Sequence, residues 1–120
     1  MTALATVLVL AVAAIHVYIL ILEMFLWRAE RGRRAFGTDQ EFADRSAPLA
    51  ANQGLYNGFL AAGLVWGAIA AEPVGFQVRV FFLGCVIVAG VYGALTVNRR
   101  ILVVQAAPAI IALAVVLLTR

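Results

Sequence analysis

The sequence predicts an all-α fold, a four-helix transmembrane bundle that runs up-down-up-down and carries one longer charged cytoplasmic loop. Hydrophobic residues make up 65% of the 120 residues and charged residues only 12%, too little polar surface for a water-soluble globule. The apolar stretches are apolar on every face, unlike the alternating strands of a barrel. At about 20 residues per spanning helix, this length allows at most four spans and no separate soluble domain. We therefore expect residues 1–120 to form a single integral membrane domain.

Each apolar stretch is long enough to cross a bilayer, because about 18 residues rising ~1.5 Å each approach its ~30 Å hydrocarbon thickness. In the first stretch, "AVA" at Ala11 to Ala13 resembles a signal-peptidase site. No positive charge precedes it and apolar residues continue to Trp27, which favours a retained helix. The last two stretches are separated only by "NRR", so they must be adjacent and antiparallel. The predicted spans are about 3–27, 49–71, 80–97 and 101–118.

The arginines predict the orientation of the spans, because cytoplasmic loops are rich in positive charge. The connection after the third span contains Arg99 and Arg100, and the opposite side offers only Arg79 and Arg120. We expect a multi-pass protein with both termini outside. The first connection, which we place in the cytoplasm, contains Arg28, Arg31, Arg33, Arg34 and Arg45.

That long first connection also contains a capping pattern. Thr38 is followed three residues later by Glu41, which predicts a short interfacial helix that carries Phe42 toward the membrane.

Small residues in the second and third spans predict close helix packing. A ridge without bulky side chains lets another helix approach, either in the same chain or in a second copy, so homo-oligomers through these faces are a candidate assembly. Cys85, the only cysteine, excludes an intramolecular disulfide and is expected to be a small core residue. The arginines flank apolar spans, which argues against nucleic-acid binding and leaves the lipid bilayer as the main partner. The ridge of the second span consists of Ala50, Gly54, Gly58 and Ala62; the third span has Gly84, Ala89, Gly90, Gly93 and Ala94.

Polar residues of all four spans share a depth. Counted inward from the cytoplasmic ends at ~1.5 Å per residue, the shallower ones lie about 4 to 8 Å inside the boundary. Tyr56 and Asn57 lie one turn deeper, and His16 lies roughly 10 Å deeper than Glu23 on almost the same face. Lipid penalises isolated polar groups, so we expect these side chains to converge. The shallower group consists of Glu23, Asn52, Gln53, Tyr92 and Gln105.

Pro108 is expected to open this region further. It cannot donate to the carbonyl of Val104, which leaves a backbone acceptor next to Gln105. A kink there widens the cytoplasmic half of the bundle. The sequence therefore predicts a polar intramembrane pocket that opens toward the cytoplasm.

The first functional hypothesis is a membrane protein that binds, transports or converts a small lipophilic ligand in this pocket. Glu23 and His16 are the candidate catalytic residues, because a buried carboxyl and an imidazole can exchange protons with a ligand. The sequence leaves open whether the protein is an enzyme, and it identifies no cofactor. The candidate ligand-binding residues are Asn52, Gln53, Tyr56, Asn57, Tyr92 and Gln105.

Two alternatives stay open. His16 permits a single axial haem ligand, which would make this a haem- or redox-associated membrane protein. No cluster of cysteines and histidines predicts a zinc or copper site. The third reading is a non-catalytic accessory subunit or helix-packing module whose polar residues only lock helices together.

Three stretches resemble a known family: "HVYILILEMFLW", "LAANQGLYNGFLAAGLVWG" and "GVYGALTVNRRILVVQAAPA". They are similar to a small bacterial four-helix integral membrane protein family of unknown function (DUF1304-like), and the likeness covers nearly the whole chain. The resemblance implies a protein of the bacterial cytoplasmic (inner) membrane. It implies no substrate, cofactor or catalytic residue.

Overall fold

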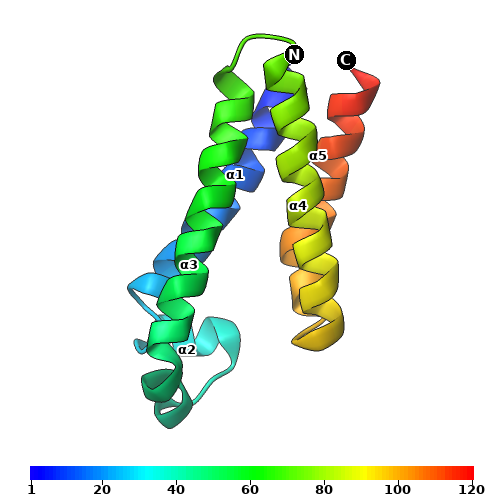
Figure 1. Cartoon of the computed structure of the whole chain (residues 1–120). Coiled ribbons are helices and arrows are strands. Elements are labelled where there is room, and N and C mark those ends of the chain that lie inside the picture. Colours follow the sequence, from blue (N-terminus) through cyan, green and yellow to red (C-terminus); the bar gives the residue numbers. More distant parts are fainter. The chain divides into compact units, whose positions relative to one another are not determined.

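The computed structural model describes residues 1–120, and the chain is helical nearly throughout (Figure 1). The predicted all-α class is confirmed, with no β-strand. The chain divides into two compact units, and the long helices α1 and α3 contribute to both. Unit 1 contains Met1–Ile15 and Leu60–Arg120, and unit 2 contains His16–Phe59. The helices are α1 (Ala3–Met24), α2 (Glu30–Phe36), α3 (Gln40–Ile69), α4 (Val74–Thr96), the π-helix η1 (Leu102–Ala106) and α5 (Ala107–Leu118).

Two helices are long and apolar enough to cross a membrane. These are α1 with 22 residues and α4 with 23 residues. The segment Leu102–Leu118, which joins η1 to α5, is apolar but shorter. The 30 residues of α3 begin with a charged stretch and contain several amides. By length and composition the chain therefore has two candidate spans, where the sequence predicts four.

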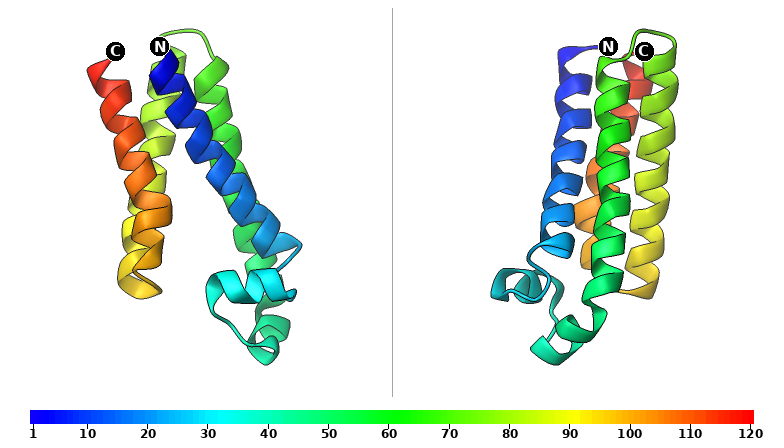
Figure 2. Two further views of the ribbon diagram at one scale, coloured as in Figure 1. Left: turned by 180° about the vertical axis from the view of Figure 1, so that it is seen from behind. Right: turned by 60° about the vertical axis from the view of Figure 1, so that its left-hand side comes forward.

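Unit 1 has one hydrophobic core to which four helical segments contribute. The first half of α1, the second half of α3, α4 and α5 each supply fully buried side chains. The two chain ends lie at the same end of this unit (Figure 2), and Thr2 caps α1 through its hydroxyl, which accepts the N–H of Ala5 at 3.1 Å. The core residues are Ala5, Val9, Val12, Ala13, Leu64, Leu83, Val86, Ala109, Ala112 and Val116.

Glycines let α4 approach the last part of the chain. A Cβ on Gly90 would lie 2.8 Å from the backbone nitrogen of Ala106, and a Cβ on Gly93 would lie 3.1 Å from Ile101. Because backbone atoms cannot move aside as a flexible side chain can, only glycine fits at position 90.

The helix α3 begins nine residues before the predicted second span. Asp39 caps it, since its Oδ1 accepts the N–H of Phe42 at 2.8 Å. The predicted cap through Thr38 is wrong, because the hydroxyl of Thr38 is buried without a hydrogen-bond partner. The short helix of this connection is α2, which precedes Thr38; it ends at Phe36 and is followed by Gly37 in the left-handed region (φ 68°).

A π-helix stands where Pro108 was expected to disturb the fourth span. The N–H of Ala107 donates to the carbonyl of Leu102, five residues earlier. Pro108 itself lies in the first turn of α5, where its missing N–H does least harm. The expected irregularity is present at this site as a change of helical register.

Unit 2 holds the connection between α1 and α3 in place by aromatic and small residues. The indole of Trp27 donates to the hydroxyl of Ser46 at 3.0 Å and lies 4.9 Å from the ring of Phe36, measured between ring centroids. Gly32 lies directly against the carbonyl of Leu26, where a Cβ would overlap it. The helix α2 is thereby docked beside the end of α1.

Candidate functional site

The polar centre of unit 2 is a contact between Glu23 and Asn57. Glu23 lies in the last turn of α1 and Asn57 in the middle of α3, and both are buried. The amide Nδ2 of Asn57 donates to Oε1 of Glu23 at 2.6 Å and to the carbonyl of Gln53 at 3.2 Å. A hydrogen bond between buried polar groups on two helices satisfies both and holds the helices in register.

Two glycines bring the helices of this pair together. A Cβ on Gly54 would lie 2.6 Å from Cγ of Met24 and 3.1 Å from Cβ of Glu23. A Cβ on Gly58 would lie 2.8 Å from Leu20. These two members of the predicted small-residue ridge therefore pack against α1 of the same chain.

His16 is fully buried in unit 2. It lies on α1 seven residues before Glu23, close to two helical turns, so the two side chains project from nearly the same face. At ~1.5 Å per residue their backbones are roughly 10 Å apart along the helix. A small ligand therefore cannot contact both Glu23 and His16 directly. Contact with both requires an extended ligand or a bridging water molecule.

Three other predicted ligand-binding residues of α3 lie at its surface. Asn52, Gln53 and Tyr56 are all exposed, and the side chain of Tyr56 packs edge-on against Phe59. Only Asn57 of this group joins Glu23. The roles assigned to the other three remain predictions.

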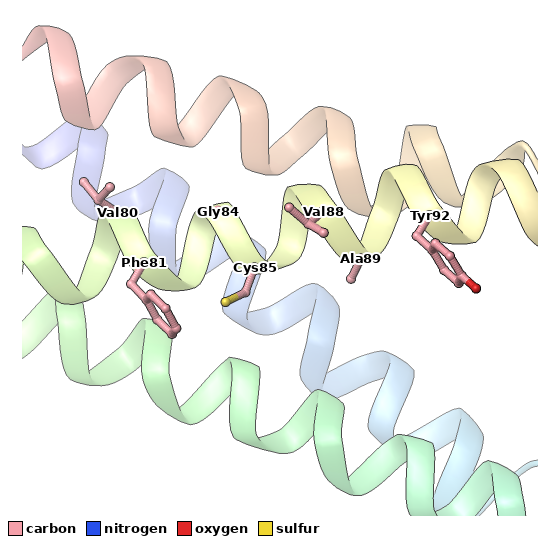
Figure 3. A pocket seen from close by; sticks show the side chains of 7 residues that line it. All are labelled: Val80, Phe81, Gly84, Cys85, Val88, Ala89 and Tyr92. Atoms are coloured by element: carbon pink, nitrogen blue, oxygen red, sulfur yellow. The ribbon is translucent and has the colours of Figure 1, made fainter.

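Tyr92 and Gln105 belong to unit 1. Gln105 is half-buried in η1, and Tyr92 is exposed at one end of an open apolar groove along α4 (Figure 3). Cys85 is half-buried and lines this groove, so the expectation of a core cysteine is wrong. A Cβ built on Gly84 would have no neighbour within 4 Å, so the groove is open at this position. The groove is lined by Val80, Phe81, Gly84, Cys85, Val88, Ala89 and Tyr92.

A buried arginine in unit 1 was missed by the sequence reasoning, which used Arg79 only as a marker of orientation. Its side chain is 5% exposed; Nη2 lies 3.0 Å from Oε1 of Glu72 and Nη1 donates to the carbonyl of Gly67 at 2.9 Å. Gly67 and Gly75 leave room for it, because a Cβ at either would lie within 3.0 Å of Arg79 atoms. The sequence did contain a signal for this site: Arg79 stands at the start of an apolar run, with Gly67 and Gly75 before it.

Glu72 lies in the turn between α3 and α4 and is half-exposed. Partial desolvation raises the pKa of its carboxyl, but the hydrogen bond and charge of Arg79 and the N–H of Phe76 outweigh that effect. The pKa of Glu72 is therefore held below the ordinary value of 4.5.

Among all described residues, no three histidine, cysteine, aspartate or glutamate side chains lie close enough together to hold a metal ion. Buried hydrogen bonds between helices join Glu23 to Asn57 and Arg79 to the carbonyl of Gly67.

Comparison with known proteins places the chain among relatives. Residues 10–117 match the model of a family described as protein of unknown function (DUF1304). The chain is 36% identical over 115 residues to the uncharacterized protein YpaA of Lactococcus lactis subsp. lactis (strain IL1403), and the match covers 94% of this chain and 96% of that protein. No solved structure matches it.

Proposed function

Since this chain belongs to the DUF1304 family, whose function is unknown, we propose a function from its own residues: it is an integral membrane protein that binds a small lipophilic ligand at Glu23 and Asn57. The observation that carries the proposal is the buried contact of 2.6 Å between these two side chains. Burial of a carboxyl group in an apolar environment costs free energy. Such a group therefore indicates a site where it binds a ligand or exchanges a proton.

The membrane part of the proposal is supported by α1 and α4, which are long and apolar enough to span a bilayer. We propose that α3 and the segment Leu102–Leu118 cross as well, giving four spans in the bacterial inner membrane with both termini outside. The arginine-rich connection between α1 and α3 then lies in the cytoplasm, in agreement with the usual charge distribution of membrane proteins.

In the proposed mechanism Glu23 gives a proton to the ligand or takes one from it. Asn57 orients the carboxyl group through its amide, and His16 takes part when the ligand is extended along α1. The buried carboxyl and amide of this pair, on two largely apolar helices, suit a ligand with one polar end and an apolar body.

The test compares small molecules that co-purify with the wild-type protein and with Glu23→Gln. Glu41→Gln is the matched control, because Glu41 is an exposed carboxylate in the first turn of α3. After purification in a mild detergent, organic extracts are compared by mass spectrometry. A lipophilic molecule should be enriched in the wild type and the control, and reduced at least about tenfold in Glu23→Gln. Equal profiles for all three proteins would overturn the proposal.

A second candidate is a packing module that associates with another copy through α4. Its specific observation is Gly84, which has open space where a Cβ would lie, next to Cys85 in the same groove. If two copies meet there, mild oxidation in membranes should give a disulfide-linked dimer through Cys85. Gly84→Leu should abolish it; no dimer in the wild type would dismiss this candidate.

The haem alternative rests on His16 alone. A visible absorption spectrum of the purified protein after haem supplementation tests it, and the absence of a Soret band would remove it.

A further inference from the structure

Arg79 is an unusual residue for a helix as apolar as α4. Its side chain is 5% exposed, and its guanidinium has two protein partners, the carboxylate of Glu72 and the carbonyl of Gly67. Its Nε is buried with no hydrogen-bond partner. A guanidinium group has five N–H donors, and a buried donor left unpaired costs free energy, so the two contacts do not complete the hydrogen bonding of this group.

The surrounding backbone is shaped around the guanidinium. A Cβ on Gly67 would lie 2.8 Å from Cγ of Arg79, and a Cβ on Gly75 would lie 2.9 Å from its Nη1. A purely structural role, closing the turn between α3 and α4, accounts for the contacts to Glu72 and Gly67. It does not account for an adjoining cavity.

A cavity of about 110 Å³ adjoins Arg79 in unit 1. This volume holds several water molecules or one small anion. A second guanidinium, that of Arg120, lies against it and is held 4.3 Å from the centroid of the Phe76 ring. The side chains that line the cavity include Glu72, Phe76, Arg79, Val116, Thr119 and Arg120.

Charge and geometry indicate the class of ligand. Two arginine side chains and one acidic side chain line the cavity, so their side-chain charges sum to a positive value. The planar fork of a guanidinium matches the oxygens of a phosphate group, and such charge-assisted hydrogen bonds are the strong ones. The hydroxyl of Thr119 also lines the cavity, but it donates to the carbonyl of Val115 at 2.6 Å, so the two guanidinium groups are the donors for an anion.

We infer that this cavity binds a phosphate group through Arg79 and Arg120. The cavity lies where α4 begins and α5 ends, at the end of unit 1 that holds both chain ends (Figure 2). If these helices cross the bilayer as proposed above, the headgroup of a phospholipid is the source of the phosphate; a soluble phosphate is the other source of the same chemistry. The site uses no residue of the Glu23–Asn57 pair, so either proposal can fail while the other holds.

The experiment measures binding to the full-length protein in detergent by native mass spectrometry. Three probes are titrated: inorganic phosphate, dihexanoylphosphatidylglycerol, and dihexanoylglycerol, which lacks phosphate. The proteins are the wild type, Arg120→Gln, Arg79→Lys, Glu72→Gln and the control Arg45→Gln, which changes an exposed arginine of unit 2.

A phosphate-containing probe should bind the wild type and Arg45→Gln, and dihexanoylglycerol should not. Arg120→Gln should weaken binding at least about tenfold, and Arg79→Lys should weaken it although the charge is kept, because a lysine has no fork. Glu72→Gln should strengthen binding, since it removes the one competing carboxylate; a purely structural ion pair predicts no such gain. Preference for dihexanoylphosphatidylglycerol identifies the headgroup, and equal binding of inorganic phosphate identifies a soluble anion.

Arg120 is exposed, so its substitution leaves the fold intact even if changes at Arg79 do not. Either of two results would overturn the inference: no phosphate probe binds the wild type, or binding is the same in Arg120→Gln and Glu72→Gln as in the wild type.

Discussion

The amide of Asn57 lies 2.6 Å from the carboxyl oxygen of Glu23 and joins the middle of α3 to the last turn of α1. Both groups are buried, so water can take the place of either hydrogen-bond partner only if the two helices move apart. The same contact that supports a ligand site therefore also contributes to stability, and the two contributions can be separated by choosing the substitution.

Asn57→Leu should destabilise unit 2 by about 1–3 kcal/mol, because it leaves the buried carboxyl of Glu23 without its amide donor. Thermal unfolding of the detergent-solubilised protein, followed by circular dichroism, measures the change. Asn52→Leu is the control, since Asn52 lies five residues earlier on the same helix and is exposed. Equal losses of stability in the two variants would show that the contact with Glu23 has no special weight.

Two glycines of α4 should respond in opposite ways to the same substitution. Gly84→Ala should leave stability unchanged or raise it by up to about 1 kcal/mol, because alanine favours helix and the site is open. Gly90→Ala should lower it by about 1–3 kcal/mol, because the new Cβ would lie 2.8 Å from the backbone nitrogen of Ala106. Unfolding temperatures of the two variants provide the comparison, and a stable Gly90→Ala protein would contradict the packing of α4 against η1.

The Glu72–Arg79 ion pair predicts a dependence of stability on pH. The pKa of Glu72 is lower in the folded protein than its ordinary value of 4.5, so its ionised form is favoured by folding. This contribution is present above pH 4.5 and is lost as the pH falls through the folded pKa, below that value. The loss of stability on acidification below pH 4.5 should be smaller in Glu72→Gln than in the wild type. Parallel curves for the two proteins would exclude a contribution from this pair.

Whether α3 crosses the membrane can be decided with single cysteines in a Cys85→Ala background. Glu41→Cys and Ala71→Cys place thiols at exposed positions on either side of the apolar part of α3. In intact bacteria from which the outer membrane barrier has been removed, a membrane-impermeant maleimide should label Ala71→Cys. It should label Glu41→Cys only after lysis, as the positive charge of the first connection requires. Labelling of both thiols from the same side would mean that α3 does not cross.

The helical segments could be predicted from the sequence, because each apolar run is also a helix. Their ends could not, since hydropathy reports what lipid accepts and not where backbone hydrogen bonds begin. The helix α3 shows the difference: it begins at Gln40 after the cap of Asp39 and passes through Pro48, before the apolar run that starts at Leu49. The sequence predicts a separate short helix around Phe42, whereas this stretch is the first part of α3.

For the candidate site, the depth of each polar residue in its predicted span indicated that these side chains converge, but it did not identify which of them are in contact. It matched Glu23 to Asn52 and placed Asn57 one turn deeper with Tyr56, whereas the structure pairs Glu23 with Asn57. An α-helix turns about 100° per residue, so the exposed side chains of Asn52 and Tyr56 point away from Asn57. Angular position together with depth would have separated them. The unpaired Nε of Arg79 depends on how α3 and α4 meet, which no pattern along the chain reports.

The wide turn of η1 has a consequence for how the last part of the chain is compared with relatives. Bonding over five residues takes up about one residue more than an α-helical turn, and that extra residue rotates everything after it by about 100°. The stripe Ala109, Ala112 and Val116 that enters the core therefore cannot be extrapolated backward past Pro108 with a constant period. Deleting one residue from 102–106 should restore that period, at the expense of the contact between Gly90 and Ala106.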